Sequence, residues 1–123
     1  IDYGTFLPVK YGAIAALNGP EEPILRQCEE YQRRRDALCG GLRAAGWNVP
    51  DSEGTMFAWA RIPEGFTDDV DFVMKLMEAT GVLCTPGSSF GTLGKGHVRF
   101  ALTLPVPVIG EAVEAVRKSG ILL

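Results

Sequence analysis

Residues 84–103 read CTPGSSFGTLGKGHVRFALT, a glycine-studded loop that runs into a short apolar strand. Because side chains alternate faces along a strand, Val98 and Phe100 are predicted to face a core while Arg99 projects from the other side, beside the loop. A guanidinium there costs free energy unless an anion compensates its charge. Its planar fork suits a carboxylate, so the stretch indicates either a carboxylate-binding site or an ion pair between Arg99 and a surface glutamate.

The loop before this strand contains PGSSFG at residues 86–91, whose glycines favour the close approach of a ligand or another chain. The next residues, GTLGKG at 91–96, look like a dinucleotide-binding fingerprint, but that fingerprint precedes a helix and here a strand follows. The single histidine, His97, has no serine or cysteine nucleophile pattern beside it, so a surface or hydrogen-bonded role is predicted rather than catalysis.

Hydrophobic periodicity predicts the remaining elements. Their order is helix, helix, strand, helix, strand, strand, helix. This order indicates an α+β fold, in which helices cover a small sheet of about three strands and one helix is long. The predicted ranges are a helix over 9–19, the long helix over 21–47, a strand over 55–63, a helix from Thr67 or Asp68 to Gly81, strands over 82–85 and 97–103, and a helix over 108–120.

The long helix carries apolar side chains at helical spacing, which predicts the face that packs on the core. Those residues are Ile24, Cys28, Tyr31, Leu38, Leu42 and Ala45. The pair Gly40-Gly41 is expected to bend or weaken the helix, at about 1 kcal/mol per glycine relative to alanine. Arg33–Arg35 are interleaved with acidic residues, so they predict a solvated surface rather than a phosphate-binding patch.

Two further groups are interpreted mainly as packing residues. Cys84 lies in a predicted buried strand and is expected to be a core thiol. Met56, Phe57 and Trp59 are expected to pack, although one face of their strand could line a pocket.

Composition indicates one ordinary globular domain. The 123 residues are 46% hydrophobic and 22% charged, which is enough for a single core, and the net charge of −3 argues against a nucleic-acid partner. Three cysteines without CxxC spacing predict reduced thiols, typical of the cytoplasm, rather than a disulfide framework or a metal site. No apolar run reaches the ~18 residues of a membrane helix and no signal-peptide pattern is present. The start without methionine suggests a piece of a longer protein.

Three segments carry a resemblance to a known family: TMFAWARIP at 55–63, GVLCTPGSSFG at 81–91 and GHVRFAL at 96–102. In them the sequence resembles the C-terminal small domain of a pyridoxal-phosphate-dependent class I/II aminotransferase, a protein of fold type I. DYGTFLPVKYGAIAALNG and YQRRRDALCGGLRAAGW extend the resemblance to essentially the whole chain. Within the family it is similar to the branch of alanine-forming (glutamate–pyruvate) and LL-diaminopimelate aminotransferases.

The resemblance implies two segments and a substrate site. Residues 1–20 would come from the large domain or the interdomain connection, and residues 21–123 would form the small domain. Arg99 would bind the α-carboxylate of an amino acid or a 2-oxo acid, and Gly87 and Phe90 would border this substrate. Tyr3, with Thr5 beside it, would lie near the active site and the interface of a homodimer.

The resemblance also implies what this chain does not hold. The lysine that forms the Schiff base with pyridoxal phosphate lies in a Ser/Thr-rich segment of the family's large domain, and no segment here matches it. Catalytic and cofactor-binding residues are therefore expected outside these 123 residues, and the chain alone is expected neither to bind pyridoxal phosphate nor to transaminate. Side-chain specificity is expected to come largely from the large domain and the partner subunit.

A function of another class fits the same residues. A small α+β regulatory module could sense amino acids through Arg99 without catalysing a reaction. A lysine-bearing large domain upstream would favour the enzyme, whereas a DNA-binding or kinase segment would favour the sensor.

Overall fold

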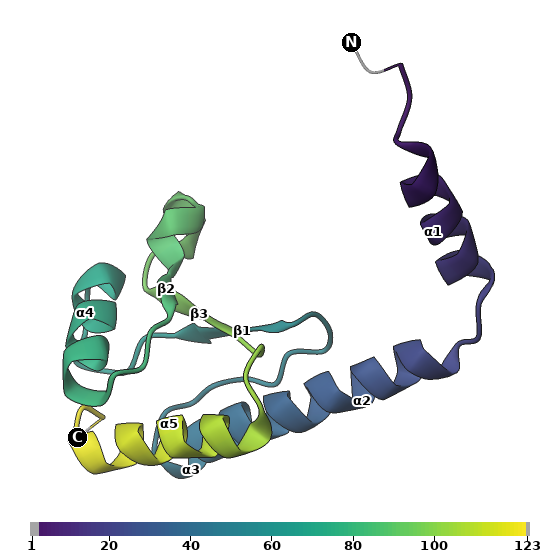
Figure 1. Ribbon diagram of the computed structural model, residues 1–123. Coiled ribbons are helices and arrows are strands. Elements are labelled where there is room, and N and C mark those ends of the chain that lie inside the picture. Colours follow the sequence, from purple (N-terminus) through teal and green to yellow (C-terminus); the bar gives the residue numbers. More distant parts are fainter. Residues whose placement is uncertain (1–2, 123) are drawn as a thin grey trace.

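The computed structural model of the protein describes residues 3–122, so Ile1, Asp2 and Leu123, at the ends of the two predicted segments, lie outside the described residues. It confirms the α+β class, with a small sheet and helices packed on one side of it (Figure 1). Besides the α-helices the structure has three short helical turns. The turn η1 is π-helical, and the turns η2 and η3 are 3-10 helical. In chain order the elements are α1 (Leu7–Asn18), α2 (Glu22–Arg35), η1 (Asp36–Gly40), α3 (Gly41–Ala44), β1 (Phe57–Arg61), α4 (Asp69–Thr80), β2 (Thr85–Pro86), η2 (Gly87–Phe90), η3 (Thr92–Gly94), β3 (His97–Ala101) and α5 (Val106–Ser119).

The sheet has three antiparallel strands in the order β1-β3-β2. Trp59 of β1 and Thr85 of β2 both lie opposite Arg99 of the central strand. Val98 and Phe100 are buried, with exposed fractions of 0% and 5%, which confirms that they face the core while Arg99 lies on the outer face. The period-two pattern of the sequence therefore set the orientation of the central strand correctly.

The strand predicted over 82–85 is wrong in its extent, because β2 is only Thr85–Pro86. The amide of Val82 donates to the hydroxyl of Thr80 at 3.1 Å, which draws it into the turn that follows α4. Leu83 is 73% exposed and packs on no core. Cys84 is nevertheless buried, as predicted for a core thiol.

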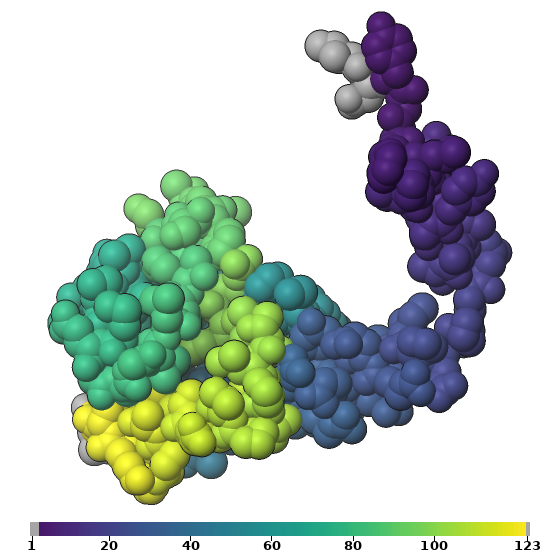
Figure 2. Space-filling view, in the orientation of Figure 1, coloured from purple at the N-terminus to yellow at the C-terminus, as the bar shows by residue number. Residues whose placement is uncertain are grey.

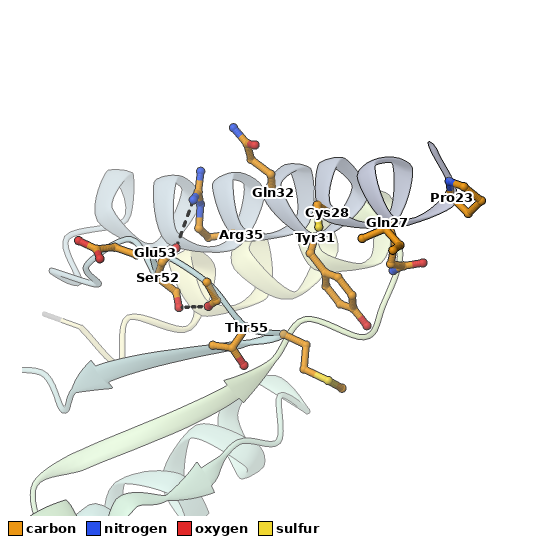
Figure 3. A pocket seen from close by; sticks show the side chains of 12 residues that line it. Pro23, Gln27, Cys28, Tyr31, Gln32, Arg35, Ser52, Glu53 and Thr55 are labelled. Atoms are coloured by element: carbon orange, nitrogen blue, oxygen red, sulfur yellow. Dashed lines mark hydrogen bonds between the residues drawn. The ribbon is translucent and has the colours of Figure 1, made fainter. Parts of the chain in front are cut away.

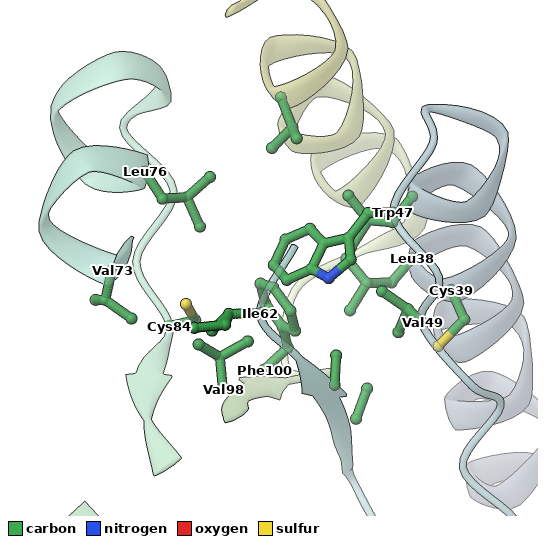
Figure 4. Close-up of a cluster of buried hydrophobic side chains, with 14 of the residues drawn as sticks. Leu38, Cys39, Trp47, Val49, Ile62, Val73, Leu76, Cys84, Val98 and Phe100 are labelled. Carbon is green, nitrogen blue, oxygen red and sulfur yellow. The ribbon is translucent and has the colours of Figure 1, made fainter. Parts of the chain in front are cut away.

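The core lies between the sheet and the helices (Figure 4). Trp47 lies at its centre, edge-on to Phe72 at 5.2 Å and to Phe100 at 5.5 Å between ring centroids. The indole N–H of Trp47 donates to the carbonyl of Arg61 at 2.8 Å, so its one polar group is satisfied although the ring is buried. This residue therefore joins the helical layer to β1.

The predicted long helix is present as α2, η1 and α3 in continuous succession. Its predicted packing face is correct only in the second half, since Leu38 and Leu42 are buried but Ile24 is 58% exposed and Cys28 is exposed. The reason is visible in Figure 1, where the first half of α2 extends beyond the sheet toward α1. Helical spacing identifies an apolar face but does not tell where along the helix the core ends.

One glycine of the pair in this helix, Gly41, permits a close helix–helix contact. The π-helical turn η1 ends at Gly40, and the helix continues from Gly41. A Cβ built on Gly41 would lie 2.7 Å from Cγ1 of Val113 in α5, closer than two carbon atoms can approach. Gly41 therefore lets α5 pack directly against the long helix.

Two of the three consecutive arginines are structural, which corrects the prediction of a solvated surface. Arg34 donates to the carbonyls of Leu102 and Thr103 at 3.2 and 3.1 Å, and Arg35 donates to the carbonyl of Ser52 at 3.2 Å. Their side chains are 17% and 24% exposed. They tie α2 to the segments that flank β1 and β3, whereas Arg33 stays on the surface.

Of the two predicted N-capping residues, Thr67 and Asp68, the structure shows Asp68 as the cap of α4, and the helix ends at Gly81 as predicted. The Asp68 carboxylate accepts from the backbone N–H of Asp71 at 2.8 Å, and Gly81 adopts the left-handed conformation with φ of 73°. These two caps fix where α4 starts and ends.

Helix α1 has no buried residue and stands apart from the sheet and its helices (Figures 1 and 2). Apolar side chains lie on all of its sides, and Phe6, Leu7 and Val9 are 58–73% exposed. A helix that is apolar all round is normally buried. Within residues 3–122 no helix combines the length and the apolar character that crossing a membrane requires.

Burial raises the pKa of the Cys84 thiol from 9.0 to about 12. A folded-state pKa above the unfolded one stabilises the fold below pH 9, and this contribution is lost as the pH rises from 9 toward 12. We therefore expect the free energy of unfolding to decrease over this range in the wild type, and less steeply in Cys84→Ala. The rate at which iodoacetamide alkylates Cys84 at about pH 8, followed by peptide mapping, gives an independent measurement of its thiolate fraction, since only thiolates react. Cys84 modified at the rate of an unfolded chain would contradict the prediction.

Candidate substrate-binding site

The outer face of the sheet carries a cluster of aromatic side chains around Arg99. The guanidinium carbon of Arg99 lies 4.1 Å from the ring centroid of Phe57 in β1 and 4.4 Å from that of Phe90 in η2. Trp59, opposite Arg99 in the register, contacts Phe90 edge-on at 5.9 Å and stacks on His97 at 5.5 Å. Cation–π contacts of this kind hold a guanidinium in place without using its N–H donors.

Arg99 has no anionic partner within the described part of the chain. None of the ion pairs and side-chain hydrogen bonds of residues 3–122 involves its guanidinium, so the interpretation as an arginine paired with a surface glutamate is not supported there. Its Nε is buried without a hydrogen-bond partner. A buried donor without an acceptor is costly, so the site is suited to an acceptor that comes from outside these residues.

The loop that carries Phe90 depends on a close contact between two glycines. A Cβ on Gly87 would overlap the carbonyl oxygen of Gly94, and a Cβ on Gly94 would overlap that of Gly87. Gly91 between them has φ of 114°, a conformation that glycine adopts without strain. The glycines that the sequence suggested for a ligand's approach thus serve first to fold η2 against η3.

A buried carboxylate links this loop to α4. Asp69 is 3% exposed, and its Oδ2 accepts from the backbone N–H of Ser88 at 2.6 Å. Burial alone would raise the pKa of Asp69, but the N–H and hydroxyl of Ser88 and the backbone N–H groups of Asp69 and Val70 hold the pKa below its ordinary value. Asp69 is not among the site residues predicted from the sequence, although its place directly after the capping Asp68 at a helix start was a signal.

The structure brings together three of the four predicted site residues. Arg99 and Phe90 are in contact, and Gly87 begins the helical turn η2 that ends at Phe90. Tyr3 is fully exposed, in the N-terminal segment that Figure 1 shows far from the sheet. Phe57, predicted mainly to pack, is a further residue of the site, and His97 has the predicted hydrogen-bonded role, with Nδ1 3.1 Å from the carbonyl of Lys95.

A separate groove of about 730 Å³ lies between α2 and residues 52–56 (Figure 3). Cys28, Tyr31 and Met56 line it together with Arg35, whose guanidinium is already bonded to the carbonyl of Ser52. The groove is lined by the apolar face of α2, which the sequence predicted to pack on the core. It contains none of the residues that surround Arg99.

The lysines of the chain do not fit a covalent site for pyridoxal phosphate. Lys75 and Lys118 pair with Asp71 and Glu114 on exposed helix faces, at 2.8 and 3.3 Å. Lys10 and Lys95 are also exposed. A lysine that forms a Schiff base needs a desolvated setting that lowers its pKa, and none of these positions provides one within residues 3–122.

Comparison with known proteins gives consistent matches in sequence and in structure. The chain is 43% identical over 121 residues to an LL-diaminopimelate aminotransferase of Halothermothrix orenii and 41% identical over 118 residues to the glutamate-pyruvate aminotransferase AlaC of Escherichia coli. These matches cover 98% and 94% of this chain but 31% and 29% of those proteins. The chain thus spans about a third of the length of the curated relatives that it matches.

Among solved structures, a probable N-succinyldiaminopimelate aminotransferase from Thermus thermophilus superposes with a TM-score of 0.83 at 33% identity, over 97% of this chain and 32% of that one. Residues 6–116 match the family described as aminotransferase class I and II. The matched range includes Arg99, the loop that holds Phe90 and the core beneath them. The chain therefore belongs to the class I and II aminotransferase family.

Proposed function

We propose that the complete protein is a pyridoxal-phosphate-dependent aminotransferase that moves an amino group between an amino acid and a 2-oxo acid, with Arg99 as the anchor of the substrate α-carboxylate. The observation that supports this role is the cationic Arg99, held by Phe57 and Phe90 with its Nε buried and unpartnered. The similarity to the glutamate-pyruvate aminotransferase AlaC supports substrates of the alanine and glutamate type. A cytoplasmic location remains a prediction from the free cysteines.

The chemistry of this anchor is positional. Two parallel N–H groups of a guanidinium match the two oxygens of a carboxylate, which fixes both the distance and the rotation of the bound acid. The rings of Phe57 and Phe90 restrict the guanidinium itself, so less freedom is lost when the acid binds. Amino acid and 2-oxo acid share the carboxylate, so one anchor serves both halves of a ping-pong reaction. When bound, pyridoxal phosphate supplies the electron sink, and we assign its binding to residues outside this chain.

The same proposal gives residues 1–20 a place against the rest of the complete protein, with residues 21–123 as the small domain. Exposed apolar side chains on all sides of α1 support it, as do Ile24 and Leu25 at the start of α2, 58% and 54% exposed. The groove of Figure 3 continues this surface along α2. Tyr3 would reach an active site only through another part of the protein or a partner subunit of a homodimer.

The proposal is tested by assaying the complete protein and the 123-residue chain side by side. We expect the complete protein with pyridoxal phosphate to convert 2-oxoglutarate to glutamate with L-alanine or LL-diaminopimelate as donor, and to form a borohydride-reducible adduct at a lysine outside this chain. The isolated chain is expected to give neither turnover nor an adduct. Amino-acid binding by the complete protein without turnover would support the sensing module instead, and an adduct at one defined lysine of this chain would overturn the assignment of the cofactor site.

A further inference from the structure

We infer that Asp69 is a positioning residue, which holds the turn Gly87–Phe90 so that the Phe90 ring fixes the guanidinium of Arg99. The inference rests on the proposed role of Arg99 as the carboxylate anchor. It names a residue of another element, α4, that acts on the site without touching the substrate.

The Asp69 carboxylate is buried. Among residues 3–122, Asp69 is the one polar or charged residue that is buried, and 3% of its surface is exposed. A carboxylate at such a position is costly unless its oxygens accept hydrogen bonds. It pairs with no lysine or arginine within this range, and it accepts instead from the Ser88 backbone N–H at 2.6 Å. The buried carboxylate of α4 therefore joins this helix to the loop at Ser88.

The turn η2 connects the Asp69–Ser88 bond to Arg99. Ser88 lies in η2, whose last residue, Phe90, has its ring centroid 4.4 Å from the Arg99 guanidinium carbon. Gly87, at the other end of η2, packs against the backbone of Gly94, so the turn is held at its start and at Ser88. Phe90 itself is 50% exposed and is not held by the core. Without the Asp69 bond, the turn that carries Phe90 loses its hydrogen-bonded link to α4.

The structure offers a matched control in the neighbouring residue. Asp68 is exposed and accepts from the backbone N–H of Asp71 at 2.8 Å, so it caps α4 without reaching the loop. Asparagine caps helices as well as aspartate does. Asp68→Asn and Asp69→Asn therefore make the same chemical change at adjacent positions, and only the second alters the bond to Ser88.

The experiment uses the complete protein with pyridoxal phosphate, the amino acid it turns over fastest in the assay above, and the amine formed by removing the α-carboxyl group of that amino acid. For Asp69→Asn we expect kcat/KM for the amino acid to fall roughly 10- to 100-fold, as for misplacement of a positioned group, chiefly through KM. The value for the amine should change little, as should both values in Asp68→Asn. In an Arg99→Lys background, Asp69→Asn should lower kcat/KM for the amino acid little further, because the guanidinium that Asp69 helps to position is already absent.

Hydrogen exchange gives a readout that does not depend on activity. Amides of residues 87–94 should exchange about 10-fold faster in Asp69→Asn, as expected when the charged acceptor of the Ser88 N–H is replaced by a neutral amide oxygen, while those of β3 and α4 should not. Asp69→Glu, which keeps the charge on a longer stem, serves the same comparison if Asp69→Asn does not fold. Equal losses for amino acid and amine in Asp69→Asn, with Arg99→Lys still selective, would overturn this inference alone. Equal losses in Arg99→Lys would instead overturn the proposed role of Arg99 as the carboxylate anchor.

Discussion

Arg99→Lys in the complete protein is expected to lower kcat/KM for amino-acid substrates by roughly 30- to several-thousand-fold. Lysine keeps the positive charge but loses the two parallel N–H donors that match a carboxylate, and it loses the flat surface that contacts Phe57 and Phe90. Truncating a desolvated, hydrogen-bonded charge pair costs on the order of 2–5 kcal/mol. The loss should appear with every α-carboxylate substrate, because the contact is common to all of them.

Two controls separate binding from folding. The amine that lacks the α-carboxylate should react at nearly the same slow rate in Arg99→Lys and in the wild type. Arg61 lies two residues beyond Trp59 on β1, on the same outer face as Arg99, and is exposed, so Arg61→Lys should leave both rates unchanged. In Arg99→Lys the free energy of unfolding should change by less than about 1 kcal/mol relative to the wild type. Equal losses for the amino acid and the amine would mean that Arg99 is a structural residue.

Phe72→Ala is expected to lower the free energy of unfolding of the region 21–122 by about 3–5 kcal/mol. Phe72 is fully buried, and its ring contacts Trp47 at 5.2 Å and Phe66 at 4.8 Å, so truncation leaves a cavity between α4 and the helical layer. A loss of this size is a large part of the roughly 5–15 kcal/mol that stabilises an ordinary domain. Hydrogen exchange of the β1 and β3 amides in the complete protein measures it.

Phe90→Ala is the matched control, since the same atoms are removed from a ring that is 50% exposed on the outer face. This variant should stay within about 1 kcal/mol of the wild type in stability but should lose activity toward amino acids. Opposite effects of the two variants would separate the core from the binding face. A large loss of stability in Phe90→Ala, or none in Phe72→Ala, would contradict the division of the sheet into these two faces.

Local features of this protein were predictable from its sequence. The alternation at 97–101 placed Val98 and Phe100 in the core and Arg99 outside, and Asp68 and Gly81 marked the ends of α4. These features depend on residues within a few positions of one another, and their spacing in the chain directly encodes them. The family followed from three short segments, and the match over residues 6–116 now supports it.

The extent of packing was not predictable in the same way. The apolar face of the long helix was correct from Leu38 onward, but Ile24 and Cys28 lie beyond the end of the core. Arg34 and Arg35 looked like surface charges and instead bind carbonyl groups of segments that follow later in the chain. Periodicity records which side of a helix is apolar, whereas burial depends on what other elements lie against that side.

The sequence by itself thus determined the order of the elements, the outward direction of Arg99 and the family. Only the tertiary structure decided what surrounds Arg99: Phe57 and Phe90 as its neighbours, Gly87 against Gly94, and Asp69 bonded to Ser88, 19 residues further along the chain. The physical reason is that these contacts join separate elements. Their distances depend on how α4, the loop and the sheet pack together, and no spacing along one element specifies that packing.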